Sequence, residues 1–215
     1  MCTLYSLRKS PAELRARFRH HSADGFPPRP EIRPMEPIAV IRGARGERQF
    51  ALLRWGFIPS WGKVEMAARP FLNARIEGIA EKPSFRHALK RRRCLIPADG
   101  FFEWQGEKGR RQAWFMARFD GGLFAMAGLW EHWMAPDGSE VEGAAIITLP
   151  ALGHLAAIHE RNPALVAEKD FDRWLDVDRV AETEALRLLA APDDEVFTAE
   201  PVGLKRARPE APRLL

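Results

Sequence analysis

The 215-residue sequence is poor in cysteine and contains no long hydrophobic run. Its two cysteines, Cys2 and Cys94, are too few and too far apart for a disulfide framework or a zinc knuckle. No apolar stretch approaches the roughly 20 residues of a membrane span, and the first residues lack the charged-then-apolar pattern of a secretory signal. These absences predict a cytoplasmic protein without a membrane partner, in which each cysteine needs its own explanation.

The charged residues give a modest positive excess that is concentrated in two places. The formal net charge is +4. One basic cluster includes Arg91, Arg92 and Arg93, and a second lies at residues 205–208. Such clusters suit a polyanionic partner, but they also occur on solvated helix faces that only keep a protein in solution. Charge alone leaves both interpretations open.

Hydrophobic periodicity and turn residues predict a fold of the α+β class. A helix is expected at residues 10–20, where Ser10 can cap, Pro11 suits the first helical position and Glu13 completes a capping box. Further helices are expected at residues 84–92, 153–159, 169–175 and 180–189. Strands are expected at residues 38–42, 49–54, 94–97, 101–105, 113–119, 123–130 and 143–149, with a last extended stretch at 202–204.

The order of these elements predicts one domain over residues 1–215. The sequence contains no repeat, low-complexity tract or linker. The expected architecture is a curved antiparallel sheet or open barrel with peripheral helices, and residues 176–215 supply a C-terminal helix and a closing segment.

Cys2 directly follows the initiator methionine, whose removal is usual when the next side chain is small. The mature chain would then begin with a free α-amine beside a thiol. Such a 1,2-aminothiol condenses with an aldehyde to a Schiff base, which the thiol closes to a five-membered thiazolidine. The reference pKa of an α-amine, about 7.7 to 8.0, leaves part of it neutral and nucleophilic near pH 7. The alternative is that Cys2 lies by chance in a disordered tail.

Three polar residues alternate with apolar ones in the segment LNARIE. If the segment is extended, Asn73, Arg75 and Glu77 share one face. Asn73 could then orient an amine or a sugar, and Arg75 could bind a phosphate. A plain solvent-facing row on a half-buried strand explains the alternation equally well.

Glu103 and His159 are candidates for proton transfer. Glu103 lies between Phe102 and Trp104, and an aromatic environment disfavours the ionised carboxylate, which suits a general acid. His159 suits a proton shuttle, although a lone histidine near a helix end is more often a capping or core residue. Metal binding is disfavoured because His154 and His159 are five residues apart and no HExxH motif is present.

The tryptophans Trp55 and Trp61 lie in a predicted aromatic loop, WGFIPSW, and are candidates for stacking on nucleic-acid bases. Trp114 and Trp130, in contrast, lie on expected strands and are assigned to the core. Cys94 lies in an apolar strand and is interpreted as a buried, inert thiol.

Together these segments resemble the SOS response-associated peptidase family, the abasic-site-processing proteins. The resemblance rests on the initial Met-Cys, on WGFIPSW, on LNARIE through AEKPSFRHALKRRRCLIPADGFFEW, and on AGLWE and IHERNP, all within about residues 1–175. It implies that Cys2 is the crosslinking nucleophile, that Asn73 holds the reacting amine and opened sugar, and that Glu103 and His159 move protons.

The resemblance also implies a partner and a process. Arg75 and the basic stretch with Arg91, Arg92 and Arg93 would contact the backbone of single-stranded DNA that carries an abasic site. The protein would act in the DNA damage and SOS responses as a monomer without a cofactor. It would shield the lesion as a covalent adduct, and its peptidase activity would be the removal of Met1, by self-cleavage or by an aminopeptidase.

The sequence departs from the family pattern in three places. Thr3 and Leu4 replace the usual Gly-Arg after the cysteine, so the arginine that normally lies beside the nucleophile is absent. Only Pro34 represents the usual Asn-x-Ala-Pro, and Asn162 replaces methionine in HxRMP. Two alternative functions also stay open: a cysteine peptidase that cleaves other proteins, and a non-catalytic binder of single-stranded DNA.

Overall fold

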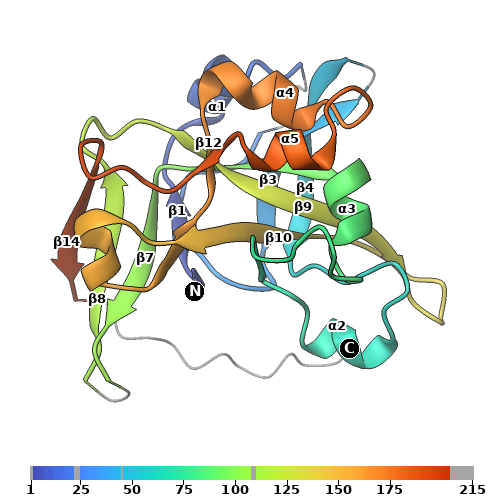
Figure 1. The fold of residues 1–215 in the computed structure, drawn as a ribbon, viewed down its shortest axis with the longest axis horizontal. Helices are drawn as coiled ribbons and strands as arrows, with labels where there is room; N and C mark the ends of the chain where they lie inside the picture. The colour runs from blue at the N-terminus through green and yellow to red at the C-terminus, as the bar shows by residue number, and fades with distance from the viewer. Residues whose placement is uncertain (1, 22–24, 45, 108–109, 204–215) are drawn as a thin grey trace.

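The computed structural model describes residues 2–21, 25–44, 46–107 and 110–203 and shows an α+β fold dominated by strands (Figure 1). The strands are β1 Tyr5–Leu7, β2 Arg29–Ile32, β3 Pro37–Ala44, β4 Glu47–Trp55, β5 Asn73–Arg75, β6 Arg93–Ala98, β7 Gly100–Gln105, β8 Gln112–Arg118, β9 Phe124–Met134, β10 Glu140–Pro150, β11 Arg161–Pro163, β12 Leu165–Val166, β13 Leu189–Ala190 and β14 Phe197–Val202. The helices are α1 Pro11–Phe18, α2 Val64–Ala68, α3 Arg86–Arg91, α4 Phe171–Leu175 and α5 Glu182–Leu186, with 3₁₀ turns η1 Gly153–Ala157 and η2 Glu168–Asp170.

Five strands form a closed barrel. The strands β4, β3, β6 and β9 pair in that order, and β10 pairs with both β9 and β4 to complete the ring. Side chains such as Val40, Leu95 and Met126 are fully buried in these strands. The α+β prediction is confirmed, but the barrel is closed, and the strand pair that closes it, β10 with β4, is parallel.

The closing contact requires a glycine. Where β10 meets the end of β4, the Gly56 N–H donates to the Ala144 carbonyl at 2.9 Å. A Cβ atom on Gly143 would lie 2.1 Å from the Gly56 carbonyl oxygen, so any side chain here would push the two backbones apart.

A second sheet packs beside the barrel and brings the N-terminal segment to it. Its strands run in the order β14, β8, β7, β1 and β2. The short strands β5 and β11 are added to the barrel, because both pair with β10. The N-terminal segment therefore lies where the second sheet meets the strands added to the barrel (Figure 1).

Local signals predicted several elements well. Ser10 caps α1, its hydroxyl accepts from the Glu13 N–H, and Glu13 completes the capping box. The expected hairpin at residues 38–54 is β3 and β4. The expected helices are shorter than predicted, and α3 begins after Phe85 without a side-chain cap from Ser84. The last extended stretch lies earlier, as β14, and residue 204 falls outside the described residues.

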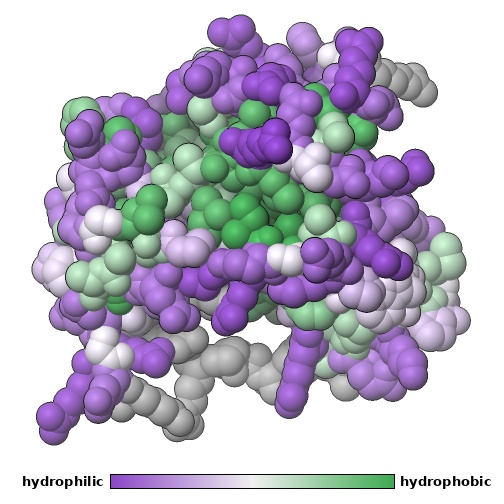
Figure 2. Space-filling model, in the orientation of Figure 1, coloured by the Kyte–Doolittle hydropathy of each residue, from purple (hydrophilic) through white to green (hydrophobic). Residues whose placement is uncertain are grey.

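The surface on the viewed face is not evenly polar. Figure 2 shows that hydrophobic side chains gather over the middle of this face, where Figure 1 shows β9 and β10, and that hydrophilic side chains surround them. Among the described residues, no helix is long and apolar enough to cross a membrane.

Candidate active site

Cys2 and Asn73 are in direct contact. The Asn73 side-chain amide Nδ2 donates to the Cys2 carbonyl oxygen at 2.9 Å. The Asn73 Oδ1 atom is buried and has no hydrogen-bond partner among the described residues. Asn73 is held by the pairing of β5 with β10, where it lies opposite Ile146. The amide therefore fixes the backbone of residue 2 and leaves one acceptor facing inward.

The Cys2 thiol is buried, with 1% of the residue exposed. Its Sγ lies 3.6 Å from the Leu4 carbonyl oxygen, which also accepts the Phe102 N–H of β7. Burial raises the pKa of the Cys2 thiol, and the charge of Glu103 raises it further. The environment of Cys2 therefore favours the neutral thiol over the thiolate.

Glu103 and His159 form the polar side of the site. Glu103 lies on β7 and is 1% exposed. This burial agrees with the expected position between aromatic residues. Its Oε2 atom is 3.7 Å from the His159 Nε2 atom. Burial lowers the pKa of the His159 imidazole. At 3.7 Å the two groups are beyond direct hydrogen-bond distance but close enough to exchange a proton through one water molecule or after a small movement.

The His159 ring has a backbone partner in either protonation state. Its Nδ1 atom lies 3.0 Å from the Arg161 backbone nitrogen and 3.1 Å from the Arg161 carbonyl oxygen. A neutral Nδ1 accepts the Arg161 N–H, and a protonated Nδ1 donates to the Arg161 carbonyl. This arrangement suits a group that gains and loses a proton during a reaction.

Two residues of this region were missed by the sequence analysis. Tyr5 is fully buried with its ring edge against Trp55, and its hydroxyl has no hydrogen-bond partner among the described residues. Burial raises the pKa of Tyr5, and the nearby Cys2 thiol adds to this. Arg161 is buried, and it binds Glu77 through two hydrogen bonds. The only sequence signals were that Tyr5 is the single tyrosine and that Arg161 lies two residues after His159.

The structure leaves some of the residues predicted to contact DNA exposed and buries others. Arg75 and Arg91 are exposed, and Trp61 is 59% exposed. The guanidinium of Arg92 is less free, because it pairs with Glu131 at 3.0 Å and lies over the Trp130 ring. Arg75 is on β5 two residues after Asn73, so one positive charge adjoins the site.

Two of these predictions are wrong. Trp55 is fully buried, and its indole N–H donates to the Leu72 carbonyl, so it cannot stack on a base. Arg93 is 1% exposed, and its guanidinium donates to four backbone carbonyls instead of a phosphate. These carbonyls belong to Leu89, Trp174, Asp176 and Val180. Arg93 fastens the segment after α4 to the barrel.

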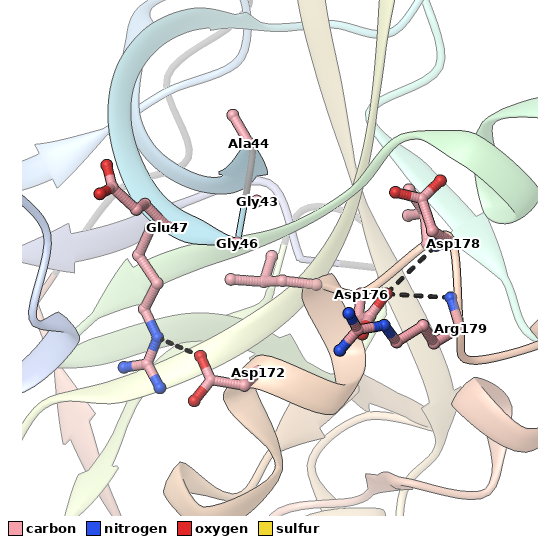
Figure 3. Close-up of a pocket in the computed structure, with 11 residues that line it drawn as sticks. Gly43, Ala44, Gly46, Glu47, Asp172, Asp176, Asp178 and Arg179 are labelled. Carbon is pink, nitrogen blue, oxygen red and sulfur yellow. Dashed lines mark hydrogen bonds and ion pairs between the residues drawn. The ribbon is translucent and has the colours of Figure 1, made fainter.

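A cavity of about 330 Å³ lies away from this site, between the β3–β4 turn and the segment after α4 (Figure 3). Three of its charged side chains, those of Arg48, Asp172 and Asp176, already bind within the protein. Arg48 pairs with Asp172 at 2.7 Å, and the Asp176 carboxylate accepts the backbone N–H of Asp178 and Arg179. Within the described residues, no three His, Cys, Asp or Glu side chains are grouped to hold a metal ion.

The fold and the site together place Cys2 beside a closed barrel, between Asn73 and the pair of Glu103 and His159. Residues 1–205 match the family described as SOS response associated peptidase (SRAP), and the chain belongs to this family. The family prediction is thereby confirmed.

Over the matched regions, the chain is about one third identical to relatives named abasic site processing proteins. It is 34% identical over 151 residues to abasic site processing protein YoqW of Bacillus subtilis, covering 70% of this chain and 67% of that protein. It is 33% identical over 194 residues to abasic site processing protein HMCES of Mus musculus. That match covers 76% of this chain but only 55% of the mouse protein.

Solved structures of similar fold come from two other bacteria. A protein from Bacteroides thetaiotaomicron superposes with a TM-score of 0.84 at 27% identity, covering 94% of this chain and 92% of that one. A protein from Bordetella bronchiseptica gives 0.81 at 25% identity, covering 94% and 100%. The barrel with its second sheet is therefore a shared architecture.

Proposed function

We propose that the protein processes abasic sites by forming a covalent thiazolidine with single-stranded DNA through Cys2. The observation that carries the proposal is the Asn73 hydrogen bond to the Cys2 carbonyl, made beside the buried Glu103 and His159. This contact fixes the backbone of residue 2 at its carbonyl, next to a group of proton donors and acceptors. The names of the relatives, abasic site processing proteins, support the same substrate.

The chemistry requires two bond-forming steps after Met1 is removed. The Cys2 α-amine adds to the aldehyde carbon of the opened sugar, and loss of one water molecule gives the imine. The thiol then adds across the C=N bond: sulfur bonds to carbon, and the thiol proton passes to nitrogen. The amine has the lower reference pKa and attacks first. The thiol can therefore stay neutral until the imine has formed.

Each polar neighbour has a distinct task in these steps. Asn73 holds the backbone of residue 2 so that the amine stays in the site. Glu103 gives a proton to the departing hydroxyl so that it leaves as water, and His159 takes up the proton that the amine releases. The 3.7 Å separation of these two side chains lets the proton return to Glu103.

DNA binding is assigned to Arg75, Arg91 and Trp61, which are exposed, and to Arg92, which is partly exposed. Arg75, beside Asn73, would bind the phosphate next to the lesion, and Arg91 with Arg92 would extend the basic surface. Trp61, 59% exposed, offers a flat ring for an unpaired base, worth about 1 to 3 kcal/mol. Leu4 is buried and uncharged where the family resemblance leads us to expect an arginine, so Arg75 would supply the positive charge beside Asn73.

The two alternatives fit the site less well. A peptidase acting on other proteins attacks with a cysteine thiolate, and burial raises the pKa of the Cys2 thiol. A non-catalytic DNA binder gives no reason to bury an acid next to a histidine, because burying charged groups is costly.

The test is an incubation with single-stranded DNA that carries one abasic site, followed by a denaturing gel. Wild-type protein should give a stable adduct, and Cys2→Ala should give none. An equal yield of stable adduct from Cys2→Ala would refute the thiazolidine, and salt-sensitive binding without any adduct would favour the non-catalytic alternative.

Removal of Met1 is proposed to be hydrolysis of the Met1–Cys2 peptide bond by the protein itself. An aminopeptidase accepts alanine as readily as cysteine after the methionine. Intact mass spectrometry should therefore find Met1 lost from the wild type and retained in Cys2→Ala. Loss of Met1 from both proteins would assign the cleavage to an aminopeptidase.

A further inference from the structure

Glu77 and Arg161 form an ion pair beside the site. The Arg161 Nη1 and Nη2 atoms donate to the two Glu77 carboxylate oxygens, each at 2.9 Å. Arg161 also donates from Nε to the Thr148 hydroxyl at 3.2 Å and from Nη2 to the Thr148 carbonyl at 2.7 Å. The Arg161 hydrogen bonds lower the pKa of Glu77, so the carboxylate stays ionised. Every guanidinium nitrogen thus has an acceptor.

The pair joins two segments that both contribute to the site. Glu77 lies in the turn after β5, the strand that carries Asn73 and Arg75. Arg161 begins β11, directly after the His159 loop. Both β5 and β11 pair with β10, and Thr148 of β10 lies between them, opposite Arg75 on one side and Pro163 on the other.

The backbone of Arg161 sets the position of the His159 ring. Nitrogen and oxygen of the same residue lie 3.0 and 3.1 Å from the His159 Nδ1 atom. A shift of Arg161 would therefore move the imidazole relative to Glu103. The guanidinium prevents such a shift, because its planar fork is fixed at Glu77 and Thr148 together.

We infer that Glu77 and Arg161 are positioning residues that hold His159 in register with Asn73. The inference rests on the proposed function, since it explains how that site keeps its geometry. Arg161 acts through its neighbours, and its own charge is neutralised by Glu77 instead of being offered to a phosphate. Misplacing one group of a reacting set by about 1 Å can cost up to about a hundredfold in rate.

The first test compares Glu77→Gln with Glu81→Gln. Both variants lose one negative charge from the same exposed turn, but only Glu77 binds Arg161. At saturating abasic DNA, the crosslinking rate should fall about tenfold in Glu77→Gln and stay within about twofold of wild type in Glu81→Gln. Affinity for intact single-stranded DNA should change equally in both. Equal crosslinking rates in the two variants would overturn the inference.

Arg161→Lys provides a second variant that keeps the charge. Lysine cannot make the paired contact with Glu77, so a positioning role requires a slower reaction with unchanged affinity for intact DNA. If Arg161 bound phosphate directly, the lysine would preserve much of the rate, and intact DNA would be bound more weakly by Arg161→Ala but not by Glu77→Gln.

A titration of the His159 ring by NMR tests the inference without DNA. The charged groups that act on His159 are Glu103, Glu160, Arg111 and the terminal ammonium. Loss of the Glu77 charge alone would lower the pKa of His159 further. Release of the ring from its buried position would instead raise the pKa towards its ordinary value of 6.5.

The inference predicts the rise in Glu77→Gln and no rise in Glu81→Gln; an unchanged or lower pKa would overturn it. If the wild-type protein forms no adduct, the proposed function fails, while this titration still decides whether Glu77 and Arg161 hold the ring.

Discussion

Cys2 and Cys94 lie in two regions that bury their thiols equally well and surround them differently. Both residues are at most 1% exposed, and burial raises the pKa of both thiols. Cys94 lies on β6 inside the barrel, where Ile96 and Gly128 pack against the same space. Cys2 lies at the barrel's edge, within reach of Asn73, and the charge of Glu103 acts on it. Burial is therefore uninformative about a cysteine's role, and the polar groups beside it are what distinguish the two regions.

The largest contrast should come from the acid beside Cys2. Glu103→Gln keeps the shape of the side chain and removes its ability to give and take a proton, so the crosslinking rate should fall about a hundredfold or more. Cys94→Ala should crosslink at the wild-type rate per folded molecule. Single-turnover gels on abasic single-stranded DNA measure both. A slow Cys94→Ala protein with a normal melting temperature would break the distinction.

The barrel region should respond in stability instead. Arg93→Met removes the cation that four backbone carbonyls share, two of them in buried hydrogen bonds, and unpaired buried groups are costly, so the free energy of unfolding should fall by about 3 kcal/mol. The exposed neighbour is the control: Arg91→Met should change it by at most about 0.5 kcal/mol. Urea unfolding measures both. Loss of DNA affinity in Arg93→Met at full stability would contradict the structural role.

The pH dependence of crosslinking should identify His159. Burial lowers its pKa below 6.5, so the folded ring is still neutral at pH 6.5 and gains a proton only at lower pH. The rate should therefore fall more steeply below pH 6.5 than protonation of the α-amine alone would cause. Stability has the same sign: the unfolded chain takes up the proton first, so the contribution of His159 is lost as pH falls below 6.5. His159→Asn should remove this additional decline, and His154→Asn should retain it.

The smallest expected effect is on the thiols themselves. Both should react slowly with iodoacetamide at pH 8, because burial limits access and disfavours the thiolate. Glu103→Gln removes a charge that raises the pKa of Cys2, so alkylation of Cys2 should rise by about twofold to fivefold. Peptide mass spectrometry should find the labelling of Cys94 unchanged. A parallel rise at Cys94 would mean that the variant had loosened the whole protein.

Sequence reasoning worked where the signal was local. The capping residues Ser10 and Glu13 marked α1, and alternating hydrophobic residues marked most strands of the barrel. The residues placed around Cys2 came from motif resemblance, and Asn73, Glu103 and His159 do meet there.

Reasoning from sequence failed where the answer depended on distant strands. Trp55 and Arg93 both belong to segments with exposed neighbours, and only the pairing of β4 and β6 within the ring turns them inward. The parallel closure through Gly143 joins segments about 90 residues apart, and no local pattern encodes such a contact. Arg161 was overlooked for the same reason, because its partners Glu77 and Thr148 lie 84 and 13 residues away in the sequence.

The dependence of the site on β10 and β11 has a consequence for the timing of synthesis. Cys2 is among the first residues to leave the ribosome, whereas the strand that supports Asn73 ends at Pro150 and the backbone that orients His159 is that of Arg161. At about 5 to 20 residues per second, the start of the chain waits roughly 8 to 30 seconds for these partners. During this interval the nascent chain presents Cys2 to any enzyme at the tunnel exit, and the thiol is enclosed only after β10 and Arg161 have been made.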